Sequence, residues 1–189
     1  VNVSQLPFWA LSVYFFWKGI NFNKKVDWIL LGFFSALGFL SKYLFIYLIA
    51  SFFIYFIFNF KRFKKLISNC LLSLLIFFIL LMPHLIWLFE NNFVTIFYGL
   101  NRSGLSDFHI SNHFVNPIIF LIKQFLILVP FLVMFLVMLK KFNFNFNFKN
   151  KKIFFLISIN LIPFLLILLT STITGAKIRT MWMTPFYLF

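Results

Sequence analysis

Long uncharged, mostly apolar runs constrain this chain more than any other feature, and residues 66–89 are one example. A helix needs about 20 such residues to cross the hydrocarbon core of a bilayer. A transmembrane β-strand is shorter and alternates between apolar and polar positions, a pattern these runs lack. Only 11% of the residues are charged and 63% are hydrophobic, whereas a soluble domain has about 25% charged residues. The sequence therefore predicts an all-α, polytopic transmembrane helical bundle.

The basic residues indicate how the bundle lies in the membrane. The formal net charge is +14, and most of it falls in three short loops, at 18–25, 61–65 and 140–152. Basic loops between apolar spans follow the positive-inside rule, so we interpret these loops as cytoplasmic and exclude nucleic acid as a partner. Two outer loops are then expected, at 90–116 and 173–182, in a multi-pass protein of a bacterial inner membrane. The predicted spans are residues 5–17, 28–41, 43–58, 66–89, 117–139, 153–172 and, as the start of a further span, 183–189.

Residues 28–58 pose a problem of length. Both flanks are predicted to be cytoplasmic, so the segment must enter the membrane and return. One helix of this length would measure about 46 Å, against a hydrocarbon core of about 30 Å. Two arms joined at "FLSKY" form a re-entrant segment or a short helical hairpin, with Lys42 at its outward tip. The alternative is one long tilted helix from which Lys42 snorkels to the surface.

Five basic residues lie outside the cytoplasmic loops and need another explanation: Lys42, Arg102, Lys123, Lys177 and Arg179. Cations beside a membrane cavity suit a phosphate or diphosphate, since arginine offers paired donors and lysine a point charge. For Lys177 and Arg179 the competing interpretation is an interfacial anchor pair that binds lipid headgroups. For Lys123 we favour snorkelling.

Carboxylates are scarce, and the chain has only three. Asp27 is predicted to be cytoplasmic. Glu90 and Asp107 fall outside, and either could act as a general base or as a metal ligand, which leaves a divalent cation open as a cofactor. Asp107 is more typical of a solvated loop acid. Glu90 directly follows a span, nearer the expected cavity mouth, and is the better functional candidate.

The histidines give a weaker signal. In "HISNH", His109 and His113 have the i, i+4 spacing that would offer two metal ligands on a helix, but no third ligand is near. His84 is expected to be a hydrogen-bonded helix residue. The sequence has no glycine-rich nucleotide loop, no Ser/His/Asp set and no Cys/His cluster. Cys70 is the one cysteine and cannot form an internal disulfide.

Three stretches, in this order, resemble the polytopic glycosyltransferases of family 39, which include relatives of protein O-mannosyltransferases and of aminoarabinose transferases. They are "LLGFFSALGFLSKYLFIYLIA", "PHLIWLFENNFVTIFYGLNR" and "GAKIRTMWMTPFYLF". The first is similar to a small-residue span that leads to a lysine. The second is similar to a Pro-x-x-x-Trp segment that closes on an arginine. The third is similar to a late loop with basic residues before Trp and Pro.

The resemblance implies a GT-C membrane fold and a hexosyl or pentosyl transferase. Such an enzyme takes a sugar from a polyprenyl-phosphate donor and places it on a lipid or protein acceptor at the outer face of the membrane. Cations on the family's motifs would face the donor phosphate. The candidate substrate-binding residues are Lys42, Lys177, Arg179, Arg102, Glu90 and Trp182.

The chain departs from the family at its N-terminus. The family's catalytic acid lies in a first outer loop that is absent here, so no catalytic base is assigned to Glu90 or Asp107. We expect a piece of a longer protein that is inactive alone. Two other functions stay open. The same cations could hold a lipid-linked saccharide in a transporter or flippase, although the paired broken helices of transporters are not visible. Lys42 could also pair with a partner's acid in a structural subunit.

Overall fold

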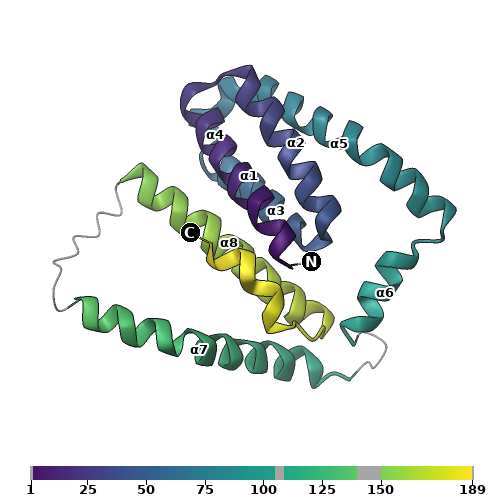
Figure 1. Ribbon diagram of the computed structural model, residues 1–189, viewed down its shortest axis with the longest axis vertical. Helices are drawn as coiled ribbons and strands as arrows, with labels where there is room; N and C mark the ends of the chain where they lie inside the picture. The colour runs from purple at the N-terminus through teal and green to yellow at the C-terminus, as the bar shows by residue number, and fades with distance from the viewer. Residues whose placement is uncertain (1, 105–108, 140–149, 189) are drawn as a thin grey trace.

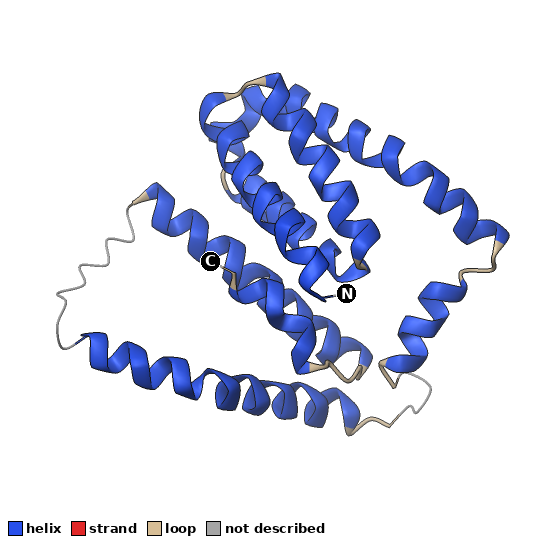
Figure 2. Ribbon diagram, viewed as in Figure 1, coloured by secondary structure: helices blue, strands red, loops and turns tan. Residues whose placement is uncertain are grey.

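The computed structural model describes residues 2–104, 109–139 and 150–188, and within these ranges it contains helices and no strand (Figure 2). The all-α prediction is confirmed. The helices, in chain order, are α1 (Asn2–Phe22), α2 (Lys25–Ser41), η1 (Tyr43–Phe45), α3 (Ile46–Phe58), α4 (Phe60–Phe63), η2 (Lys64–Leu66), α5 (Ile67–Glu90), α6 (Val94–Arg102), α7 (Asn112–Leu139), α8 (Lys151–Thr174) and η3 (Thr180–Tyr187).

Three helices in the described part of the chain are long and apolar enough to cross a membrane, at Lys64–Glu90, Asn112–Met138 and Lys151–Thr174. Only 22%, 11% and 22% of their apolar windows are buried inside the protein. Apolar helices that leave this much surface uncovered need lipid or further protein around them. The chain is therefore a helical membrane protein. That α1 and α2 also cross the bilayer stays a prediction.

The predicted break in residues 28–58 is confirmed. The α2 helix ends at Ser41, Lys42 is extended (φ −166°, ψ 129°), and the 3-10 turn η1 leads into α3, which runs back alongside α1 (Figure 1). Gly38 allows the sharp turn, because a Cβ at this position would overlap the Phe45 ring. Lys42 thus lies at the tip of a hairpin, and the single tilted helix is wrong.

The core of the bundle is aromatic and centres on α1. One face of α1 is buried at i, i+4, i+7 and i+11, by Trp9, Val13, Phe16 and Ile20, as expected for a period of 3.6 residues. The Trp9 ring lies 5.0 Å from the Phe186 ring, so η3 is packed onto the bundle. The α2 helix contacts both α1 and α5, while α3 contacts α8.

Two predicted boundaries differ from the structure. Residues 183–189 were expected to begin a further span, but the described residues form the end of the 3-10 helix η3. The outer segment 90–116 was expected to be a loop, but it contains the α6 helix. The charge of this segment gave the loop prediction, whereas α6 is a short amphipathic helix that a search for spans does not detect.

Candidate anion site at one end of the bundle

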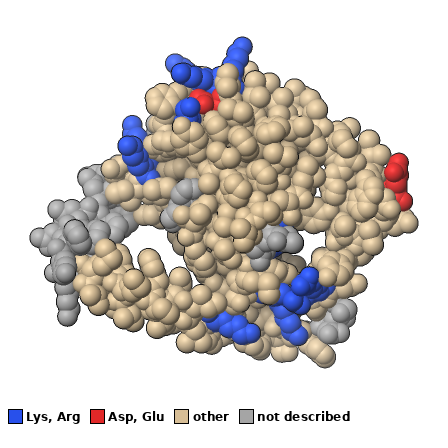
Figure 3. Space-filling model, viewed as in Figure 1, with Lys and Arg blue, Asp and Glu red and all other residues tan. Residues whose placement is uncertain are grey.

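Lysine and arginine side chains gather in two separate regions of the surface (Figure 3). One region covers the turn between α1 and α2, the α4 turn and the start of α8. The other lies where α6, α7 and the segment after α8 meet. The second region corresponds to residues that the positive-inside rule does not explain.

Four of these cations line one cavity of about 460 Å³. Arg102 comes from the end of α6, Lys123 from α7, and Lys177 and Arg179 from the segment that follows α8. Figure 3 shows the blue patch at this end of the molecule. Elements far apart in the sequence thus bring four positive charges to one hollow, and among the described residues no carboxylate lines it. Such an arrangement attracts an anion.

Backbone and amide contacts fix the segment that carries Lys177 and Arg179. Gly175 ends α8 with φ 70°, a left-handed conformation that favours glycine. The Asn116 side chain is buried and donates from Nδ2 to the Gly175 carbonyl at 2.6 Å. The Lys177 backbone N–H donates to the Ser103 carbonyl at 2.8 Å. These bonds join the ends of α6, α7 and α8, so the cations are held on a fixed backbone.

Lys42 lies beside this cluster. Its Nζ sits 5.5 Å from the centre of the Trp182 ring, which is a cation–π contact. Partial burial, with the Arg102 guanidinium as the second cause, lowers the pKa of Lys42 from its ordinary 10.5 to about 8. An anion bound beside Lys42 would favour its charged form and raise this pKa again. The structure thus brings together Lys42, Trp182, Arg102, Lys177 and Arg179 from the predicted set.

Lys123 is the residue that the sequence argument missed, because it was interpreted as snorkelling. In the structure it lines the cavity together with Asn116, Ile119 and Phe120. These positions follow i, i+3, i+4 and i+7, so they share one face of α7. Asn116 and Phe120 are both buried on that face. The signal in the sequence was Asn116, a polar residue seven positions before Lys123 and thus on the same face of the helix.

Glu90 does not line this cavity. It ends α5, and the nine residues of α6 follow the turn after it. A helix of nine residues is about 13 Å long, and Arg102 stands at its far end. The expectation that Glu90 lies at the cavity mouth is therefore not supported. Asp107 lies outside the described residues.

The histidines have structural partners. The Tyr43 hydroxyl is 2.8 Å from His84 Nε2, which confirms the hydrogen-bonded interpretation of His84. His113 donates from Nδ1 to the Thr172 carbonyl at 2.9 Å. Among the residues that the structure describes, no group of three histidines, cysteines or acids could hold a metal. His109 and His113 thus gain no third ligand there.

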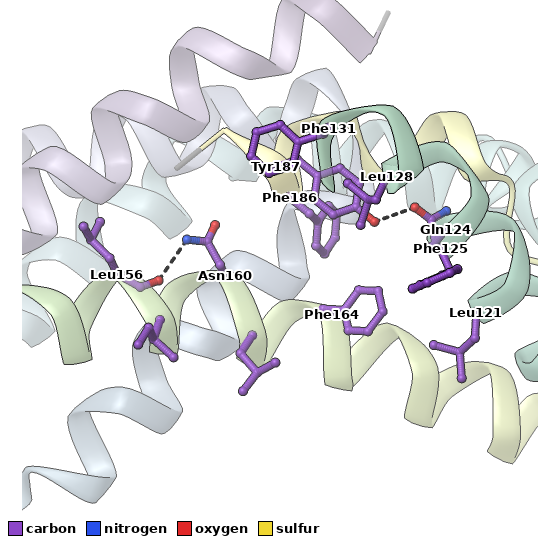
Figure 4. Close-up of a pocket in the computed structure, with 12 residues that line it drawn as sticks. Leu121, Gln124, Phe125, Leu128, Phe131, Leu156, Asn160, Phe164, Phe186 and Tyr187 are labelled. Atoms are coloured by element: carbon purple, nitrogen blue, oxygen red, sulfur yellow. Dashed lines mark hydrogen bonds between the residues drawn. The ribbon is translucent and has the colours of Figure 1, made fainter. Parts of the chain in front are cut away.

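A second, larger cavity of about 870 Å³ lies between α7, α8 and η3 (Figure 4). Its lining is mostly apolar and includes Phe125, Phe164 and Phe186. The Tyr187 hydroxyl donates to Gln124 Oε1 at 2.5 Å, which ties η3 to α7. Adjacent residues of α7, Lys123 and Gln124, line the cationic and the apolar cavity respectively. The two cavities therefore neighbour each other.

Comparison with known proteins supports a sugar-transferring role. Residues 1–87 match the family model of dolichyl-phosphate-mannose-protein mannosyltransferases. No curated protein and no solved structure matches the chain. The matched residues include Lys42 and end within α5, so they hold most of the aromatic core and the hairpin. They do not include the four cations that line the cavity, Arg102, Lys123, Lys177 and Arg179. The family match thus supports a membrane glycosyltransferase through the part of the chain that carries the hairpin lysine.

Proposed function

We propose that this protein is part of a membrane glycosyltransferase that uses a polyprenyl-phosphate sugar as donor, and that the cationic cavity holds the donor phosphate. One observation carries the proposal. Four cations from three separate elements line a cavity whose neighbour is apolar. A polyprenyl-phosphate sugar combines an anionic headgroup with a long apolar chain, and these two surfaces complement its two parts.

The chemistry follows from where charge develops. In sugar transfer, an acceptor oxygen bonds to the anomeric carbon while the bond from that carbon to the phosphate oxygen breaks. The electron pair leaves with the phosphate, so negative charge grows on the leaving group. Fixed cations stabilise this charge more in the transition state than in the ground state and so lower the barrier. Arg102 and Arg179 offer paired donors, whereas Lys123 and Lys177 contribute point charges.

The acceptor proton needs a base. Among the described residues no carboxylate lines the cationic cavity, and Glu90 stands at the far end of α6. We therefore assign donor binding and leaving-group stabilisation to these residues, and no general base. The acceptor, a lipid or a protein of the envelope, is proposed only from the resemblance.

The test is transfer in membranes that contain the full-length parent protein, since the chain alone is expected to be inactive. We expect radiolabelled polyprenyl-phosphate sugar to label an envelope acceptor, and Lys42→Ala to reduce this labelling at least tenfold. Lys24→Ala is the matched control, since Lys24 is an exposed lysine beside the opposite turn, and it should leave labelling unchanged. Movement of the labelled lipid across the bilayer without transfer would instead support a flippase. Equal labelling in all variants would contradict the proposal.

A further inference from the structure

The α6 helix has two faces of opposite character. At 100° per residue, Ile96, Phe97 and Leu100 share one face, and Thr95 and Arg102 share the other. The three apolar side chains are 38%, 58% and 42% exposed. The polar face is tied to the protein near its two ends, because Thr95 is half-buried and Arg102 lines the cationic cavity, whereas Gly99 between them is open. The usual amphipathic arrangement, with apolar residues inward, is thus reversed.

Hydrogen bonds fix this orientation at both ends of the helix. Thr95 Oγ1 lies 2.8 Å from the Tyr43 hydroxyl, which also contacts His84. Just after α6, the Ser103 carbonyl accepts from the Lys177 backbone N–H. The polar face is therefore held toward the hairpin tip and the cavity, and the apolar face is directed away from the protein.

The position of α6 along the bundle suggests what covers that face. The α6 helix follows the end of α5, a helix that is apolar and long enough to cross a membrane. Asn92 and Phe93 join them with positive φ values of 49° and 55°. At this turn the chain leaves the direction of α5 and runs toward the ends of α7 and α8 (Figure 1). A helix placed sideways at the end of a spanning helix lies at the depth of the bilayer interface.

Exposed apolar side chains are also present at the end of the spanning helix that precedes α6. Trp87 and Phe89, in the last turn of α5, are 41% and 69% exposed. Tryptophan is typical of the interface between headgroups and acyl chains. Exposed apolar side chains thus occur on both sides of the turn that joins α5 to α6.

We propose that α6 lies in the bilayer interface at the cavity end of the bundle, with Ile96, Phe97 and Leu100 among the lipids, and that this seating holds Arg102 at the cationic cavity. The occupant of the exposed face is thus the membrane itself. The location of α6 is independent of the activity, whereas the role given to Arg102 rests on the proposed function.

The location is tested by spin labels in the full chain with Cys70→Ser as background, reconstituted in phosphatidylethanolamine–phosphatidylglycerol vesicles. Labels are placed through Phe97→Cys, Leu100→Cys and, as control, Gly99→Cys. Gly99 lies on the polar side of α6, and a Cβ there meets nothing within 4 Å. We expect labels at 97 and 100 to collide with oxygen more than with a water-soluble nickel chelate, and the label at 99 to show the reverse. Equal nickel access at all three positions, or protection of 97 and 100 from both reagents, would overturn the proposal.

The positioning role is tested by the affinity for undecaprenyl phosphate in the same vesicles. Leu100→Ser should weaken binding severalfold, Gly99→Ser should not, and Leu100→Ser should add little in an Arg102→Gln background. Unchanged affinity in Leu100→Ser would overturn the role given to Arg102. If the unaltered protein binds no undecaprenyl phosphate, the proposed function fails, but the collision measurements still decide the location of α6.

Discussion

At one end of the bundle Lys24, Lys25, Lys64 and Lys65 are exposed beside short turns, and at the other end Arg102, Lys123, Lys177 and Arg179 line a cavity. At the first end the one ion pair between described residues joins Lys18 to the buried Asp27 at 3.2 Å. At the second end cations converge without a carboxylate among the described lining residues. If these turns are cytoplasmic, as predicted, their basic residues set the orientation of the helices in the membrane. Basic residues thus occur at both ends, and their type does not distinguish the two. Only at the second end do their side chains line a cavity that could hold a ligand.

The largest effect is expected from removing two cations at the cavity end. Lys177→Gln with Arg179→Gln removes charge-assisted contacts worth about 1.5–3 kcal/mol each, so the affinity for undecaprenyl phosphate in nanodiscs should fall about 100-fold or more. The matched control, Lys64→Gln with Lys65→Gln, removes the same charge at the other end and should change affinity less than about twofold. Equal losses in both pairs would mean that the two ends act only through net charge.

The second-largest effect is expected from overpacking the hairpin tip. A Cβ at Gly38 would overlap the Phe45 ring, and overpacking of this kind costs about 1–3 kcal/mol. Gly38→Ala should therefore lower the thermal midpoint, followed by circular dichroism in detergent, and weaken anion binding because Lys42 is displaced. Gly99→Ala in α6 is the control, since that position is open and alanine favours a helix by about 1 kcal/mol. A Gly38→Ala protein as stable as the original would show that the tip is not tightly packed.

Two asparagine hydrogen bonds, one at each end of the bundle, allow the contribution of each end to stability to be compared. Asn116 Nδ2 donates to the Gly175 carbonyl from a buried position, whereas Asn69 Nδ2 donates to Asn23 Oδ1 at 2.7 Å in an exposed one. Asn116→Ala leaves a carbonyl without its buried partner and should cost about 1–3 kcal/mol of unfolding free energy. Asn69→Ala should cost about 0.5 kcal/mol or less, because water replaces the bond. A larger loss from Asn69→Ala would reverse this comparison.

Features that depend on local sequence were predicted better than features that depend on tertiary contacts. Long apolar runs, a break at Lys42 and clustered lysines are local signals, and each fixed an element without tertiary information. Lys123 was interpreted as snorkelling and not as part of the site, because the sequence does not show which groups face a lysine on a helix. Glu90 was expected near the cavity mouth because it directly follows a predicted span. The α6 helix instead separates Glu90 from Arg102.

The smallest effect is expected from pH, and it acts through Lys42 at the cavity end. The pKa of Lys42 is lowered to about 8, so its ammonium group is charged below that pH and neutral above it. A bound phosphate favours the charged form, so affinity should fall severalfold between pH 7 and 9, with proton uptake on binding at pH 8. Lys42→Arg keeps its charge over this range and should remove the pH dependence while retaining most of the affinity. Calorimetry in two buffers of different ionisation enthalpy measures the proton uptake. No uptake at pH 8 would mean that the bound anion does not change the pKa of Lys42.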